Sequence, residues 1–245
     1  MLWIFSILCV SAIAGAHWLA DKVATRPDRE QMRWASFGGG AGIAYVFVHL
    51  LPELASHGQA LSEAPGMETF APTPITEALL FLIALAGIMV TYSIDVLATH
   101  ERQAGRIAGS LHTLHFAAIS YLYAYSLPSL ISTGLAYGIL FTIAISAHVL
   151  LADRTMAARH PAIFRTRMRW LGTAALALGL LHAALLHPVA DLHLAIATAY
   201  LGGGLLMAVF REELPAVNRT RLGWFLAGTV SMTSLLLLAL SHATH

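Results

Sequence analysis

Basic residues divide this chain into alternating stretches. All fourteen Lys and Arg residues occur in four short stretches, and the long segments between them are apolar and contain none. The four stretches hold Lys22, Arg26, Arg29 and Arg33; Arg102 and Arg106; Arg154, Arg159, Arg165, Arg167 and Arg169; and Arg211, Arg219 and Arg221. Basic loops of membrane proteins stay on the cytoplasmic side. The alternation therefore predicts a chain that crosses a bilayer repeatedly, with every basic loop inside.

The apolar segments have the length that this interpretation needs. About 20 apolar residues cross the hydrocarbon core of a bilayer, and 58% of the chain is hydrophobic while only 11% is charged. Eight such segments are predicted, at residues 2–20, 34–53, 76–98, 107–127, 130–152, 168–187, 193–211 and 222–242. An even number of spans with basic loops inside places both termini outside. The expected fold is an all-α integral membrane protein of the plasma membrane, a single polytopic domain over residues 1–245.

Two of these segments resemble each other. Gly38-Gly39-Gly40 is followed by Phe47 and Leu51-Pro52, and Gly202-Gly203-Gly204 is followed by Phe210 and Leu214-Pro215, with the Gly-to-Phe spacing differing by one residue. The charge rule gives the two segments opposite directions, which predicts a 3+2+3 inverted repeat of the kind found in transporters. Alternatively, the glycine triplets simply permit close helix packing. We expect Gly39 and Gly203 at tight helix contacts.

Ionisable side chains at membrane depth are candidate functional residues, because burying them in a bilayer is costly. His112 and His115 lie three residues apart and share one helical face. His148, with Asp153 near the cytoplasmic end of its segment, follows in the next span, and a turn near Pro128 would join the two spans. The depths of His115 and His148 differ by only about 4.5 Å at 1.5 Å per residue. Imidazole and carboxylate groups suit zinc, although a lone membrane histidine often just bonds a backbone carbonyl.

The end of the second segment resembles a known family. It reads His49-Leu50-Leu51-Pro52-Glu53, and it is similar to the outer end of the second helix in ZIP (Zrt/Irt-like) metal transporters. The segment from Gly202 to Pro215 resembles the seventh helix of that family. The resemblance implies eight helices with both termini outside, a 3+2+3 inverted repeat, and transport of divalent cations, zinc first among them. It also makes His49 and Glu53 candidates for the outer entrance.

The metal-binding motifs of the family are only partly present. The family's fourth helix has a His-Asn-x-x-Asp/Glu-Gly motif, where this chain has Phe116 and Ile119 at the Asn and acid positions. Its fifth helix has His-Glu-x-Pro-His-Glu, of which the first His and the last acid remain. The expected ligands are therefore His115, His148 and Asp153, with His112 nearby, in a thinned single-metal site.

Other readings compete with transport. A relative that kept the fold but lost its ligands would be a transport-incompetent sensor or scaffold, and histidines on facing helices could also hold a haem. A retinal Schiff base is not expected, because the only lysine, Lys22, is predicted to lie in a loop. No nucleophile–base–acid arrangement indicates an enzyme. The expected partners are the lipid bilayer and a divalent cation as substrate, without organic cofactor or nucleic acid; a homodimer is compatible with this architecture.

Overall fold

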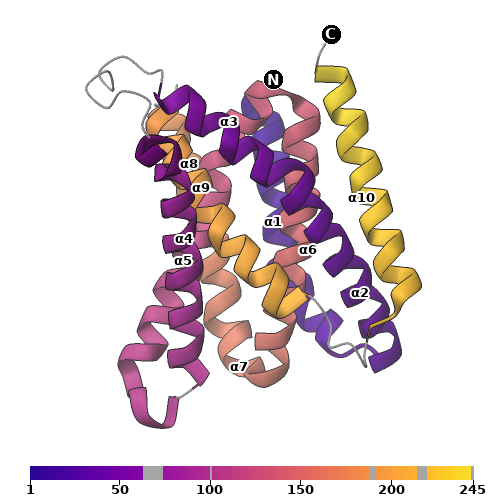
Figure 1. The fold of residues 1–245 in the computed structure, drawn as a ribbon. Coiled ribbons are helices and arrows are strands. Elements are labelled where there is room, and N and C mark those ends of the chain that lie inside the picture. Colours follow the sequence, from indigo (N-terminus) through magenta and orange to yellow (C-terminus); the bar gives the residue numbers. More distant parts are fainter. Residues whose placement is uncertain (63–73, 100, 188–190, 214–219, 244–245) are drawn as a thin grey trace.

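All the regular secondary structure in the part that the structure describes is helical. A computed structural model describes residues 1–62, 74–99, 101–187, 191–213 and 220–243. The elements are α1 (Leu2–Ala24), α2 (Asp28–Tyr45), η1 (Val46–Leu50), α3 (Leu51–Ser62), α4 (Pro74–Thr99), α5 (Glu101–Thr133), α6 (Leu135–Arg159), α7 (Pro161–Ile163), η2 (Phe164–Met168), α8 (Arg169–Leu185), α9 (Asp191–Ala208), η3 (Val209–Glu213) and α10 (Leu222–Ala243). Helix α1 begins, and α10 ends, at the same end of the bundle (Figure 1).

Six helical stretches in the described residues are long and apolar enough to cross a membrane. They are Leu2–Ala24, Arg29–Ser56, Leu135–Ala158, Pro161–Leu185, Leu192–Arg211 and Leu222–Ser241. Helix α4 contains a shorter apolar stretch, Ala78–Ile94. Helix α5 is not among the six, and its described part is interrupted by polar groups such as those of His112 and His115. The all-helical membrane architecture is thus confirmed; eight spans and their orientation stay predictions.

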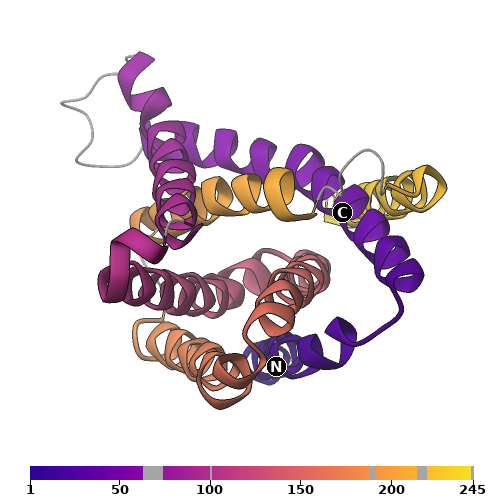
Figure 2. The same cartoon turned by 90° about the horizontal axis from the view of Figure 1, so that it is seen from below.

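The helices form two groups that face each other. Helix α1 packs mainly on α6 and α5 on α8, whereas α2 packs on α10 and α4 on α9. Viewed along the bundle, α1, α5, α6 and α8 lie together on one side and α2, α4, α9 and α10 on the other (Figure 2). We call them the α5/α6 group and the α2/α9 group.

Glycines set the closest contacts inside the α2/α9 group. A Cβ atom on Gly40 or Gly228 would collide with a main-chain carbonyl across the α2–α10 contact, and one on Gly203 or Gly87 would do so across the α9–α4 contact. The carbonyl oxygens belong to Phe225, Phe37, Ala84 and Tyr200, respectively. Such small residues let backbones approach closely in membranes. The tight contact predicted at Gly203 is confirmed. In the first triplet Gly40 makes a comparable contact, and the contact predicted at Gly39 stays a prediction.

Each of the two long helices at the group boundary contains a π-helical turn. The first covers Val46–Leu50 and the second Val209–Glu213. Pro52 follows the first turn, and proline has no N–H for the carbonyl four residues earlier. The wide turn takes up this mismatch without ending the helix, and π-turns often occur at functional sites.

Two boundaries predicted from the sequence are wrong. The turn expected near Pro128 lies at Gly134, because α5 runs through the fully buried Pro128 to Thr133. Close packing around a buried helix stabilises it despite the one backbone hydrogen bond that proline removes. The second error is the end of the segment predicted at residues 34–53, since helix α3 continues to Ser62. Residues 63–73, which follow α3, lie outside the described residues.

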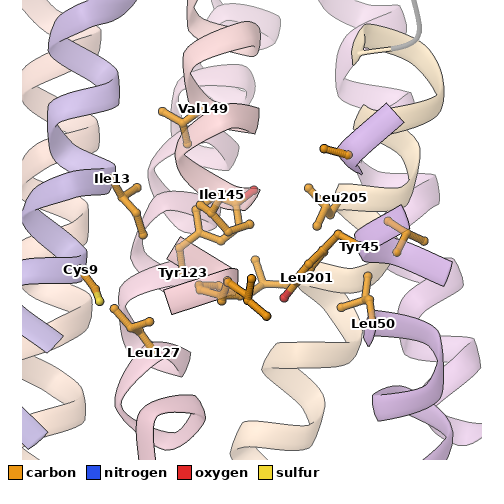
Figure 3. Close-up of a cluster of buried hydrophobic side chains, with 14 of the residues drawn as sticks. Cys9, Ile13, Tyr45, Leu50, Tyr123, Leu127, Ile145, Val149, Leu201 and Leu205 are labelled. Carbon is orange, nitrogen blue, oxygen red and sulfur yellow. The ribbon is translucent and has the colours of Figure 1, made fainter. Parts of the chain in front are cut away.

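An apolar core joins the two groups at mid-height. Tyr45, Leu201 and Leu205 of the α2/α9 group lie opposite Tyr123 and Ile145 of the α5/α6 group (Figure 3). All five side chains are buried. This layer positions the cavities described next, because it separates the polar groups near the two ends of the bundle.

Candidate metal site

The four residues predicted as metal ligands line one cavity. This inner cavity of about 150 Å³ lies between the two helix groups, with His112 and His115 on α5 and His148 and Asp153 on α6. Helices α4 and α9 close the other side, where the hydroxyl of Thr91 lies 3.3 Å from His115 Nε2. The similar depths inferred for His115 and His148 thus correspond to a shared space.

The four predicted ligands line the cavity without converging on one point. Within the part of the chain that the structure describes, no three His, Cys, Asp or Glu side chains are close enough to hold one metal ion. His148 packs edge-on to the ring of Tyr123, with ring centroids 6.4 Å apart. Closing the ligands around an ion therefore requires rotamer changes or a shift of α5 against α6.

A residue that the sequence reasoning missed contacts one of these ligands. His17 of α1 lies with its Nδ1 atom 2.6 Å from Oδ2 of Asp153, and both side chains are almost fully buried. The two residues are 136 positions apart in sequence. The sequence does contain one signal for His17. Burying an imidazole at membrane depth is costly, so a histidine without a polar partner on its own helix needs a partner on another helix.

The predicted entrance residues form a pair near the opposite end. His49 of η1 and Glu53 of α3 are one helical turn apart, and His49 Nε2 lies 3.2 Å from Glu53 Oε2 without hydrogen-bond geometry. The ring of Tyr137 stacks on that of His49 at 5.5 Å. Both residues line an outer cavity of about 340 Å³, which α5, α6 and α10 complete.

A narrow neck lies between the outer and inner cavities. It has a volume of about 20 Å³ and walls from both helix groups. A space of roughly 10–15 Å³ is needed for one water molecule, so the neck has room for about one. Glu53 and Leu130 line both the outer cavity and the neck, and Tyr123 lines both the neck and the inner cavity.

A fourth cavity opens below the inner one. It has a volume of about 730 Å³ and lies between α5, the end of α6 and the α7–α8 segment. His112 and Met156 line both this lower cavity and the inner cavity. His160 and Arg167 are among its polar wall residues. Four cavities therefore follow one another from the outer pair to the end of the bundle that α7 occupies.

The size of the inner cavity limits what it can hold. Pockets for organic ligands usually measure about 300–1,000 Å³, and about 150 Å³ is available beside His115 and His148. A partly hydrated ion fits this space better than a haem macrocycle does. The donors present, imidazole and carboxylate, suit zinc and similar divalent ions.

Comparison with known proteins adds no assignment. No protein-family model and no curated protein matches the chain.

Proposed function

We propose that this chain transports divalent transition-metal cations, represented by zinc, across the membrane. The observation that carries the proposal is the series of four cavities joined by shared wall residues. Titratable groups stand on both sides of the neck, with His49 and Glu53 at one side and Asp153 with three histidines at the other. A cation could thus find donors before and after the constriction. The similarity to ZIP transporters in the His49–Glu53 segment supports the same substrate class.

The distribution of charge gives the direction of the path. Two basic stretches lie at the α1–α2 junction and around α7, so this end of the bundle is assigned to the cytoplasm. The outer cavity then opens on the outer face, where the sequence places five acidic and no basic residues: Glu53, Glu63, Glu68, Glu77 and Asp191. Negative charge at an entrance raises the local concentration of cations.

The neck requires movement of one helix group against the other. Its walls are largely apolar, and a space for about one water cannot pass a hydrated ion. The outer cavity, the neck and the inner cavity all lie between the α5/α6 group and the α2/α9 group. A rocking or elevator shift along this boundary would open the outer side while closing the inner one.

An inverted repeat would supply the two states that such a shift needs. The same sequence offset relates Gly40 to Gly203, Phe47 to Phe210 and Pro52 to Pro215. Aligned on these glycines, the two segments have equal Gly-to-Phe spacing. A second offset relates the α10 contact residues Phe225 and Gly228 to the α4 contact residues Ala84 and Gly87. Matching glycine contacts and matching π-turns support two related halves of opposite direction.

A transport-incompetent sensor or scaffold is the second candidate. It is favoured by the spread of the ligands, since no three of them converge in the described residues. The two candidates differ in one measurable respect, because a sensor binds the ion without moving it.

Zinc uptake by proteoliposomes tests the proposal. Liposomes containing wild type and a zinc-responsive dye should show saturable uptake, and His115→Ala or His148→Ala should each remove most of it. The double variant should cost little more, because partners in one site are not additive. His193→Ala, an exposed histidine of α9, is the matched control and should keep wild-type uptake.

Two outcomes would contradict the proposal. Zinc that binds to purified wild type but never enters the liposomes would favour the sensor. Wild type that neither binds nor transports zinc would remove the metal site altogether.

A further inference from the structure

The contact between His17 and Asp153 links two helices and the inner cavity. Nδ1 of His17 on α1 lies 2.6 Å from Oδ2 of Asp153 on α6, and the residues are 1% and 3% exposed. Asp153 also lines the inner cavity, and His17 is not among the residues that line it. His17 thus contacts the carboxylate from behind.

The surroundings of His17 hold its ring in one orientation. A Cβ atom on Gly172 of α8 would lie 2.6 Å from Nε2, so only glycine leaves room for the imidazole there. Phe116 packs edge-on to the ring at 5.5 Å. Nε2 is buried and has no hydrogen-bond partner among the described residues. Among the described residues, the polar partner of this ring is therefore Asp153.

This arrangement assigns a role to each atom of the pair. The neutral tautomer with its proton on Nδ1 donates to Oδ2 and leaves no buried N–H without an acceptor. Oδ2 then accepts a hydrogen bond from His17, so Oδ1 is the oxygen that this pair leaves without a hydrogen bond. Groups that bond a metal ligand from behind orient it, and their loss typically lowers metal affinity by about 10–100-fold.

We propose that His17 is a positioning residue that restricts Asp153 to one metal-binding oxygen. This inference rests on the proposed function. Two imidazoles and one oxygen form a donor set for zinc and other first-row transition ions. Calcium needs six to eight oxygens and often takes carboxylates in two-oxygen mode. By denying Asp153 that mode, His17 contributes to selectivity for zinc and other imidazole-preferring ions over calcium and manganese, which prefer oxygen ligands.

A purely structural role for the pair is the alternative, in which it only joins α1 to α6. Three variants separate the two roles. His17→Ala removes the contact, and His17→Asn keeps an N–H donor near the position of Nδ1. Gly172→Ala displaces the ring without altering either partner. Ile13→Ala is the matched control, because Ile13 is a fully buried apolar residue on the same helix, so its loss weakens packing without touching the carboxylate.

The experiment measures zinc uptake against concentration in proteoliposomes, together with competition by manganese and calcium. His17→Ala and Gly172→Ala should raise the KM for zinc by about 10–100-fold with a smaller change in Vmax. Competition by manganese and calcium should increase, and His17→Asn should restore much of the wild-type behaviour. Ile13→Ala should lower thermal stability while leaving KM and the competition pattern unchanged.

A binding measurement keeps this result separate from the fate of the transport proposal. Cobalt(II) binding to each purified variant in detergent, followed by its absorption spectrum, needs no transport. If wild type binds cobalt but does not transport, the transport proposal fails and the His17 effect is still read from the cobalt Kd. The positioning role is overturned if His17→Ala matches Ile13→Ala in KM, cobalt Kd and competition. Absence of cobalt binding by wild type would overturn it as well.

Discussion

Gly203 of α9 lies directly against the main-chain carbonyl of Ala84 in α4, with no room for a side chain between the two helices. Gly203→Leu should therefore force the helices apart. Overpacking of this kind costs about 1–3 kcal/mol or more. The thermal stability of the detergent-purified variant, followed by size-exclusion chromatography after heating, should fall clearly below wild type. Gly15→Leu is the control, because a Cβ at Gly15 meets open space; equal stability of the two variants would contradict the packing argument.

Membrane orientation can be tested with single cysteines in a Cys9→Ser background. Ser132, near the α5–α6 turn, and Ala162 in α7 are both exposed and lie at opposite ends of the bundle. Ser132→Cys should react with an impermeant maleimide added to intact cells, whereas Ala162→Cys should react only after permeabilisation. Labelling of both cysteines from one side would exclude the proposed topology.

Metal binding should depend on pH through the imidazoles of the inner cavity. Metal ligation requires neutral imidazole, because a proton and the ion compete for the same nitrogen lone pair. The zinc affinity should therefore fall as the pH is lowered. Isothermal titration over a pH series measures the profile. The His115→Ala/His148→Ala variant should lose this dependence together with its affinity; a wild-type affinity that rises on acidification would contradict neutral imidazole ligands.

The outer pair should affect capture of the ion more than its passage. Glu53→Gln removes the carboxylate charge at the mouth of the neck while keeping the shape of the side chain. The KM for zinc should rise, and Vmax should stay near wild type once the substrate is saturating. Ser56→Ala, which lines the same outer cavity, serves as control. An unchanged KM for Glu53→Gln would remove Glu53 from the entrance.

The helical architecture and the gathering of the ligands were predictable for the same reason. Hydropathy and the positions of the basic loops indicate how deep each residue lies in the membrane. His115 and His148 could therefore be predicted to lie at a similar depth. Rotation about the helix axis is less well encoded, which is why a convergent site was expected and the described ligands stand apart.

Other features depend on contacts that depth alone does not reveal. His17 contacts Asp153 only because α1 packs on α6, and the sequence of the first segment does not indicate which helix packs against it. Pro128 suggested a turn because proline disfavours helix interiors, yet its burial on all sides keeps α5 continuous. The π-turn at Val46–Leu50 leaves no local signal except the proline that follows it.

The narrow neck also determines where the membrane potential acts. If water fills the outer and inner cavities, the voltage difference falls mainly across the short apolar section between Glu53 and Tyr123. A divalent ion that crosses this section moves two charges through most of the field, which is worth about 4.6 kcal/mol per 100 mV. A cytoplasm at negative potential would thus drive inward movement even without a concentration gradient, and the steepest voltage dependence is expected for the step that passes Tyr123.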